Sequence, residues 1–299
     1  MRTFLLKLSL FAGILILVDI ALGGVFKFYN YAKGGEIGKI NTVMREASPR
    51  LLVLGSSRAT HHYVPNILQD SLKISVLNAG LDGHGLPFGY GFFLGISERE
   101  VPKYLICDLH PRFDMFEDKA SADVSSFYPY MDIDGIDDLI YDFEPSDRIK
   151  TISNSYRLNS ALFRLLPSII SHREYREDGY IPLKGNIDTI TASEPKTITQ
   201  TLDLTKLKYL NSLIKKAQSY GCKIILTVSP MFRVDKKQIE FFKDEINKLK
   251  QQGMYVLWHL DDTMFISHGE YFQDLTHMNQ IGSEKYTKII ATELKALLE

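Results

Sequence analysis

The chain has 299 residues, of which 45% are hydrophobic and 24% charged, and its formal net charge at pH 7 is −1. This length and composition are those of a globular protein, with room for one large α/β domain and an elaboration. A nearly neutral chain without a long basic run argues against a nucleic-acid partner. No segment recurs at a fixed period and none is of low complexity, which argues against repeat architectures.

The N-terminal segment 1–27 differs from the rest of the chain. Arg2 and Lys7 precede an apolar run over residues 8–25 that only Asp19 interrupts. About 20 apolar residues cross a bilayer, and positive charge ahead of them favours a cytoplasmic N-terminus. We therefore expect an uncleaved single-pass anchor in the inner or cytoplasmic membrane, with the remaining chain outside the cytoplasm.

A cleaved signal peptide is the alternative, because Ala21-Leu22-Gly23 offers small residues at a suitable spacing. The apolar run is long for such a peptide, whose hydrophobic region usually has about 7–15 residues. Asp19 is unusual in lipid, and it is expected either to pair with a partner helix or to lie near the outer interface. The following residues, 28–48, are expected to form a membrane-proximal stalk.

Beyond the stalk, short apolar strands alternate with helices. We expect strands at 51–55, 74–78, 103–109, 223–228 and 254–260, and helices at 64–72, 87–97, 203–219, 235–251 and 279–299. This alternation predicts the α/β class, with a five-stranded parallel sheet in a three-layer sandwich and helices on both faces.

The alternation stops over residues 113–200. This segment carries many acidic residues and tyrosines, several prolines and glycines, and one predicted helix, at 159–171. We interpret it as a cap-like insertion over the carboxyl edge of the sheet. The predicted organisation is therefore an anchor, a stalk, and an α/β domain at 49–299 that contains the insertion.

Several polar residues follow the predicted strands directly. Ligands bind outside the carboxyl ends of the strands in parallel sheets. That rule brings residues 55–57, residues 78–80 and His110 to one edge of the sheet. The loop that leads to Asp274 and His277 reaches the same edge, so the topology predicts a site there.

Ser57 is the expected nucleophile of this site, because a serine between a buried strand and a helix has its backbone amide free to face an anion. Ser56 is the alternative nucleophile, and either serine could instead simply cap the helix. His277 is the expected base, and Asp274 would hold its other ring nitrogen. A hydroxyl, an imidazole and a carboxylate are the parts of an acyl-ester site.

Three blocks of the chain resemble those of the SGNH (GDSL-type) hydrolases. Leu54-Gly55-Ser56-Ser57 is similar to the first block, with Ser56 in place of the usual aspartate. Residues 78–83, Asn-Ala-Gly-Leu-Asp-Gly, look like the second block, and residues 274–277, Asp-Leu-Thr-His, look like the last. The resemblance covers most of 50–112 and 203–299.

The resemblance implies the flavodoxin-like fold of these hydrolases and a catalytic triad of Ser57, His277 and Asp274. It also implies that the backbone amides of Ser57 and Gly83 form the oxyanion hole. We further expect a set of polar side chains to line the substrate pocket: Ser56, Arg58, Asn78, His84, His110 and Arg112.

The third block departs from the family pattern, which normally contains an asparagine that binds the oxyanion. Here the third strand ends in Asp108-Leu-His110-Pro-Arg112, without an asparagine. A third donor is therefore missing or replaced by His110 or Arg112. The same departure resembles membrane-anchored proteins of alginate O-acetylation and lipoteichoic acid D-alanylation, which work with a polytopic membrane acyltransferase.

These observations predict an extracytoplasmic, membrane-anchored enzyme that moves an acyl group, acetyl above all, to or from a cell-surface or secreted polysaccharide. A lipid or carboxyl esterase with an apolar acyl channel is one alternative. A non-catalytic glycan-binding or assembly module is another, since the asparagine is absent. We expect no cofactor and no metal, because His61, His62 and His84 lack carboxylate partners at ligand spacing.

Overall fold

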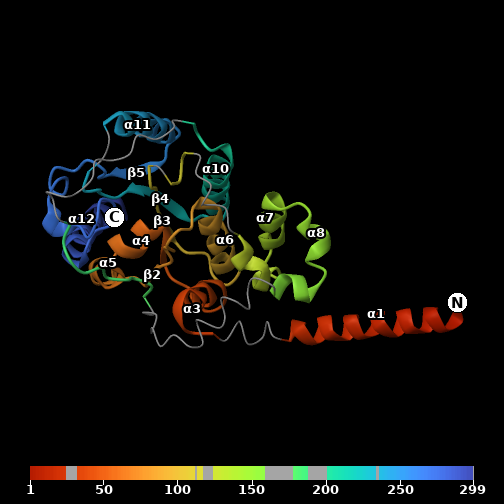
Figure 1. The fold of residues 1–299 in the computed structure, drawn as a ribbon. Helices are drawn as coiled ribbons and strands as arrows, with labels where there is room; N and C mark the ends of the chain where they lie inside the picture. The colour runs from red at the N-terminus through yellow and green to blue at the C-terminus, as the bar shows by residue number, and fades with distance from the viewer. Residues whose placement is uncertain are drawn as a thin grey trace. The chain divides into compact units, whose positions relative to one another are not determined.

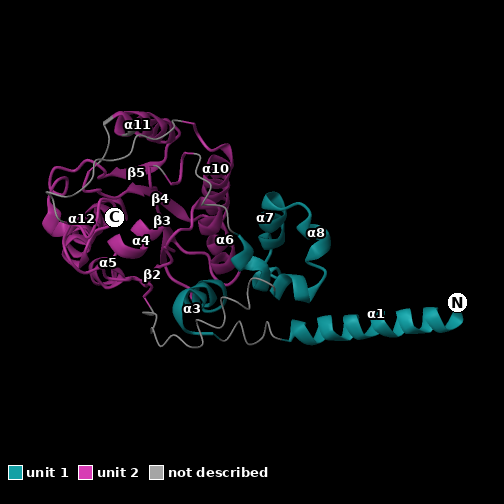
Figure 2. Ribbon diagram, in the orientation of Figure 1, with its two compact units in different colours: residues 1–46, 124–175 teal, residues 47–123, 176–299 magenta. Residues whose placement is uncertain are grey.

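A computed structural model of the protein describes residues 1–24, 32–111, 113–116, 124–158, 178–187, 201–233 and 236–298. These residues form two compact units (Figure 2). The larger unit comprises 47–123 and 176–299, and the smaller one comprises 1–46 and 124–175. The smaller unit thus combines the N-terminal segment with part of the predicted insertion.

A five-stranded parallel sheet forms the centre of the larger unit, with the strand order β2-β1-β3-β4-β5 (Figure 1). The strands are β1 (Leu51–Gly55), β2 (Val76–Asn78), β3 (Tyr104–Asp108), β4 (Lys223–Val228) and β5 (Tyr255–Trp258). The predicted α/β class with five parallel strands is confirmed. β1 and β3 are almost entirely buried, which explains why they are continuous apolar runs rather than alternating ones.

Helices cover both faces of this sheet (Figure 1). On one face α12 (Gln280–Leu298) packs against α4 (Ser57–His62) and α5 (Pro65–Leu72), and on the other α6 (Leu86–Ser97) packs against α10 (Leu204–Ser219). A further helix, α11 (Lys236–Gln251), contacts β5. This arrangement is the predicted three-layer sandwich.

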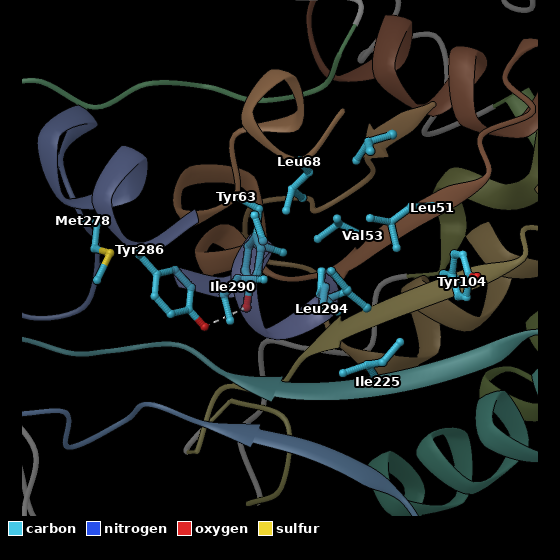
Figure 3. Packing of buried hydrophobic residues seen from close by; sticks show 14 of the residues in the cluster. Leu51, Val53, Tyr63, Leu68, Tyr104, Ile225, Met278, Tyr286, Ile290 and Leu294 are labelled. Atoms are coloured by element: carbon cyan, nitrogen blue, oxygen red, sulfur yellow. Dashed lines mark hydrogen bonds between the residues drawn. The ribbon is translucent and has the colours of Figure 1, made fainter. Parts of the chain in front are cut away.

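The main core lies between the sheet and α12. Leu51 and Val53 of β1 point into it together with Ile290 of α12 (Figure 3). Leu54 faces α6, since a Cβ atom on Gly89 of that helix would lie 3.9 Å from it. This alternation follows from the two-residue period of a strand. Full burial of each such side chain contributes roughly 1.5–3 kcal/mol, so both faces of the sheet stabilise the unit.

The predicted helix at 64–72 agrees with α5, which begins at Pro65 and ends at Leu72. A shorter helix, α4, precedes it from Ser57 to His62, and the extended residues Tyr63 and Val64 separate the two. Proline is favoured in the first turn of a helix, because backbone amides there donate no intrahelical hydrogen bond and proline, which lacks the N–H, therefore loses none. α4 was not predicted because it has only six residues and lacks an apolar period.

The smaller unit contains one long helix and several short ones. The described ones are α1 (Arg2–Gly23), α3 (Gly35–Asn41), the π-helix η1 (Thr42–Glu46), the 3-10 helix η2 (Ser125–Tyr130), α7 (Ile136–Phe143), α8 (Asp147–Lys150) and a helical segment that starts at 154. Within the described part of the chain, α1 is the one helix long and apolar enough to cross a membrane. None of its residues is buried.

Part of the segment that we expected to be a stalk is folded. Residues 35–46 are helical, and their apolar side chains Ile37, Ile40, Val43 and Met44 are buried. Arg45 donates to Asp132 over 2.6 and 2.8 Å, and its guanidinium lies 5.2 Å from the centre of the Tyr130 ring. The segment therefore packs with the insertion. The helix predicted at 159–171 lies outside the described residues.

Gly80 allows the loop after β2 to approach α4 closely. A Cβ atom built on Gly80 would lie 2.4 Å from the amide nitrogen of Thr60 and 2.6 Å from the Cβ of Ala59. Asn78 holds the same contact, since its amide donates to the Ala59 carbonyl at 2.7 Å and its Oδ1 accepts from the Gly80 amide at 3.0 Å.

We expect Gly80→Ala to lower the free energy of unfolding by about 1–3 kcal/mol, the usual cost of overpacking. Gly89→Ala is the matched control, because a Cβ there would meet only Leu54, at 3.9 Å. Gly89 lies inside α6, where alanine favours the helix by up to about 1 kcal/mol. Urea unfolding of the full chain in detergent measures both effects. Equal stabilities of the two variants would contradict the close approach at Gly80.

Candidate active site

Ser57 lies at the carboxyl end of β1, as the first residue of α4. Gly55 makes this turn possible: its φ is +146°, and a Cβ there would lie 2.8 Å from the Asp108 carbonyl oxygen and 2.9 Å from the Ala59 Cβ. As the first residue of a helix, Ser57 has a backbone N–H without an intrahelical acceptor. The turn thus presents a hydroxyl and an amide proton at the edge of the sheet.

The side chains of Ser57, His277 and Asp274 form a continuous line of hydrogen bonds. Ser57 Oγ lies 2.7 Å from His277 Nε2, and His277 Nδ1 lies 2.8 Å from Asp274 Oδ2. Asp274 Oδ1 also accepts from the backbone amides of Thr276 and His277, each at 2.8 Å. The carboxylate needs a proton on Nδ1, so the neutral imidazole presents a lone pair on Nε2 to the serine hydroxyl.

The environment of Asp274 favours its ionised form. Partial burial raises the pKa of this carboxyl, but the hydrogen bond and charge of His277 and the amides of Thr276 and His277 outweigh it. The net pKa therefore lies below its usual value. An ionised carboxylate at Nδ1 can stabilise an imidazolium, which is what proton transfer from a serine requires.

His62 joins the helix that carries Ser57 to the loop that carries His277. Its Nε2 accepts from the backbone amide of Met278 at 2.9 Å, and its Nδ1 lies 2.9 Å from Ser229 Oγ. Burial, together with the charge of Arg58, lowers the pKa of His62 well below its usual value. The ring is therefore neutral, and a proton on Nδ1 allows it to make both bonds.

Arg58 and Asp108 form a buried ion pair beneath this site. Both side chains are fully buried, with Arg58 Nε 3.5 Å from Asp108 Oδ2. Arg58 also donates to Ser229 Oγ and to the Ser229 carbonyl oxygen, while Asp108 Oδ1 accepts from Tyr63 Oη at 2.7 Å and from the Ser229 amide at 3.0 Å. These hydrogen bonds offset the cost of removing two charges from water.

Two of the side chains expected to line the pocket are used inside the fold instead. Arg58 is committed to its ion pair with Asp108, and Asn78 is fully buried and bonded to backbone of α4. Ser56 is also buried, with 3% of its surface exposed. These residues lie at or next to the carboxyl ends of β1 and β2, as the sequence predicted, but the sequence did not reveal that their side chains point into the fold. Arg112 lies outside the described residues.

His110 follows the end of the strand next to β1. Gly55 pairs with Asp108 in the register of β1 and β3; Ser57 begins α4 two residues after Gly55, and His110 lies in the loop two residues after Asp108. His110 Nδ1 accepts from the backbone amide of Phe113 at 3.1 Å, so the neutral ring carries its proton on Nε2. His110 can therefore act as a hydrogen-bond donor.

Gly83 and His84 lie on the loop that follows β2. The Leu81 amide donates to the Gly55 carbonyl at 3.0 Å, so this loop runs along the end of β1. Gly83 is exposed with a φ of +74°, a conformation that favours glycine. The His84 ring is 4.2 Å from the ring of Phe88. The roles of Gly83 in an oxyanion hole and of His84 in a pocket stay predictions.

His61 is a neighbour of the triad that we considered only as a metal ligand. Its ring meets the His277 ring edge-on at 5.6 Å, its Nδ1 lies 2.7 Å from the Ile181 carbonyl, and its Nε2 lies 3.2 Å from Asp82 Oδ2. The sequence could have indicated this neighbour, because His61 follows Ser57 by four residues and residues four apart lie on the same face of a helix. Over the described ranges, no group of three or more potential ligands could hold a metal.

No protein-family model and no curated protein matches the chain. Several solved structures resemble it. A protein from Desulfitobacterium hafniense DCB-2, described as lipolytic and of the G-D-S-L family, is 13% identical, with a TM-score of 0.43 over 81% of this chain and 97% of its own. A Bacteroides fragilis NCTC 9343 protein described as an acylhydrolase is 10% identical, with a TM-score of 0.42 over 83% and 88%.

A third structure, described as a platelet activating factor from Streptococcus pneumonia, is 12% identical, with a TM-score of 0.41 over 97% of this chain and 98% of its own. At such identities and TM-scores, these similarities give no information about the activity of this chain.

Two buried groups near the site make stability depend on pH in opposite directions. Burial raises the pKa of Asp114, which accepts from the His110 amide at 2.7 Å, from 3.8 to about 7. Between pH 3.8 and about 7, the folded protein therefore binds a proton on Asp114 that the unfolded chain does not. The contribution of Asp114 to the free energy of unfolding falls as the pH rises through this interval. His62 has a lowered pKa, so the unfolded chain binds its proton first, and stability is lost as the pH falls below about 6.5.

We expect two variants to separate these effects, each of which amounts to at most about 1.4 kcal/mol per pH unit. His62→Gln leaves Asp114, so its stability should fall as the pH rises from 5 to 7. Asp114→Asn leaves His62, so its stability should rise over the same interval. Urea unfolding at pH 5, 6 and 7 measures both, and parallel pH profiles of the two variants would contradict the assignment.

Proposed function

We propose that the chain is a serine acyl-ester enzyme, anchored in a membrane by α1, with its site outside the cytoplasm. The observation that carries this proposal is the line from Ser57 Oγ to His277 Nε2, at 2.7 Å, and from His277 Nδ1 to Asp274, at 2.8 Å. A serine on an imidazole that is itself held by a carboxylate is an activated nucleophile.

In the proposed first step, Ser57 Oγ forms a bond to the acyl carbon while His277 Nε2 takes the hydroxyl proton. The tetrahedral intermediate then loses its alcohol, which leaves with that proton, and an acyl-serine remains. Water or a sugar hydroxyl attacks this ester next, again with His277 as base, and releases Ser57. Asp274 holds the imidazolium in both steps.

The oxyanion of the intermediate requires donors, and we assign the backbone amides of Ser57 and Gly83 to it. His110 is the candidate for the third donor in place of the absent asparagine. Its Nε2 carries a proton, and it follows β3 at the same edge of the sheet at which Ser57 follows β1. One such donor contributes roughly 3–4 kcal/mol to the transition state in comparable sites.

We expect Ser57→Ala to lower the hydrolysis of 4-nitrophenyl acetate by the full chain by about 10³-fold or more, because no other group replaces the nucleophile. Ser56→Ala is the matched control, since the adjacent serine is buried and Ser57 holds the contact with His277. A fluorophosphonate should label the wild type and Ser56→Ala but not Ser57→Ala. Full activity of Ser57→Ala would remove this residue from the mechanism.

The substrate that we propose is an O-acylated polysaccharide of the cell surface, with acetyl as the acyl group. Two observations support it: α1 is long and apolar enough to anchor the chain in a membrane, and the third block resembles that of anchored polysaccharide O-acetylation proteins. A polytopic membrane acyltransferase is the partner that this resemblance favours. Such a partner would supply the acyl group that Ser57 accepts.

Transfer and hydrolysis can be separated by an acceptor. We expect acetylated mannuronate oligosaccharides to appear when the full chain in detergent is given 4-nitrophenyl acetate and the free oligosaccharides, and Ser57→Ala to yield none. Mass spectrometry of the products measures the transfer. Preference for long-chain esters without sugar acylation would favour a lipid esterase, and sugar binding with neither turnover nor fluorophosphonate labelling would favour a non-catalytic module.

A further inference from the structure

The charged residue within α1 is bonded to the insertion of the same unit. Asp19 Oδ1 accepts from Ser153 Oγ at 2.7 Å and from the amide and hydroxyl of Ser155 at 2.8 Å each, and its Oδ2 accepts from the Asn154 amide at 3.0 Å. These donors belong to Ser153, which precedes a helical segment that starts at 154, and to the first two residues of that segment. Asp19 therefore caps a helix that lies about 135 residues further along the chain.

A second contact lies one helical turn further along α1. A Cβ built on Gly23 would be 3.0–3.3 Å from side-chain atoms of Asn154, so the absence of a side chain at 23 allows Asn154 to approach the helix. Residues 19 and 23 share one face of α1 because they are four apart. One face of α1, which carries Asp19 and Gly23, therefore packs against residues 153–155.

This contact determines the depth of the insertion relative to the apolar helix. An α-helix rises about 1.5 Å per residue, so Asp19 lies about 6 Å before Gly23, the last residue of α1. The 22 residues of α1 span about the thickness of a bilayer's hydrocarbon core, roughly 30 Å. Residues 153–155 lie alongside the last turn of α1, which would reach the boundary between hydrocarbon and headgroups if α1 spans a bilayer.

The turn that leads into this contact exposes two isoleucines. Ile149 is 77% exposed and Ile152 is 80% exposed. Asp147 points the other way: it is fully buried and accepts from Tyr128 Oη at 2.5 Å and from Tyr156 Oη at 2.8 Å. The polar group of the turn is held inside, so the apolar side chains are left on the outside.

We propose that residues 147–155 form a lipid-contacting surface, with Ile149 and Ile152 inserted at the hydrocarbon boundary of the leaflet that α1 exits. The occupant is the bilayer itself, because the surface is continuous with the anchor at Asp19 and Gly23. Asp19 in this arrangement fastens the surface to the anchor.

The inference is tested with the full chain in phosphatidylcholine vesicles. A nitrobenzoxadiazole label is placed on Ile152→Cys and, as a control, on Leu204→Cys, since Leu204 is 77% exposed in the larger unit. The native thiols Cys107 and Cys222 are 1% and 3% exposed and should not react. We expect the label at 152 to be quenched by doxyl lipids and protected from iodide, with emission at a shorter wavelength than the label at 204.

Asp19→Leu provides the second arm of the test. Leucine keeps α1 apolar but removes the acceptor of Ser153 and Ser155, so the label at 152 should lose doxyl quenching and become accessible to iodide. A label at 152 that responds equally in Asp19→Leu would overturn the fastening role of Asp19.

Three other results would overturn the lipid surface. Iodide quenching at 152 as strong as at 204 would place the turn in water. Protection from both quenchers, or protection that grows with the protein-to-lipid ratio, would assign the surface to a protein partner or a second copy. Release of the chain from membranes by carbonate would mean that α1 is not an anchor. None of these results depends on the chemistry of Ser57.

Discussion

The hydrogen bond from the Met278 amide to His62 Nε2 is the contact on which the candidate site depends. It joins α4, which begins with Ser57, to the loop that ends in His277. His62 can accept this bond because burial keeps its ring neutral, and Ser229 and Asp108 hold the opposite side of the same network. An isolated charge could not be buried there, so Arg58 and Asp108 are present together. The floor of the site is thus a network of buried polar groups, in which Arg58 Nη1 has no hydrogen-bond partner among the described residues.

The sequence predicted those strands and site residues of the larger unit that depend on short stretches of neighbouring residues. Strands at 51–55 and 223–228 match the structure residue for residue, because each is an apolar run with a glycine or a polar residue at its ends. The blocks around Ser57 and His277 could be found because chemistry restricts the residue types there. What could not be predicted depends on side-chain direction: Arg58 faces the interior although its neighbour Ser57 faces the site.

The smaller unit was harder to predict for a different physical reason. Residues 35–46 are short and mixed in polarity, and their partners are far away in sequence: Arg45 meets Asp132 87 positions later. The spacing of apolar residues along a short segment cannot predict a contact between residues so far apart in the sequence. Asp19 shows the same limit. Its sequence context indicated only that a carboxylate in an apolar helix needs a polar environment, and the donors that supply it belong to residues 153–155.

The distance of 220 positions between Ser57 and His277 has a consequence for biosynthesis. Contacts between remote segments form late, and chains emerge from the ribosome with the N-terminal part first. The emerging polypeptide already carries the serine and α4, but it lacks both the imidazole and the amide that His62 accepts from. Until His277 has been synthesised, the Ser57 hydroxyl lacks its partner in this line of hydrogen bonds. The line can therefore form only after the C-terminal part of the chain has been made and has packed onto the sheet.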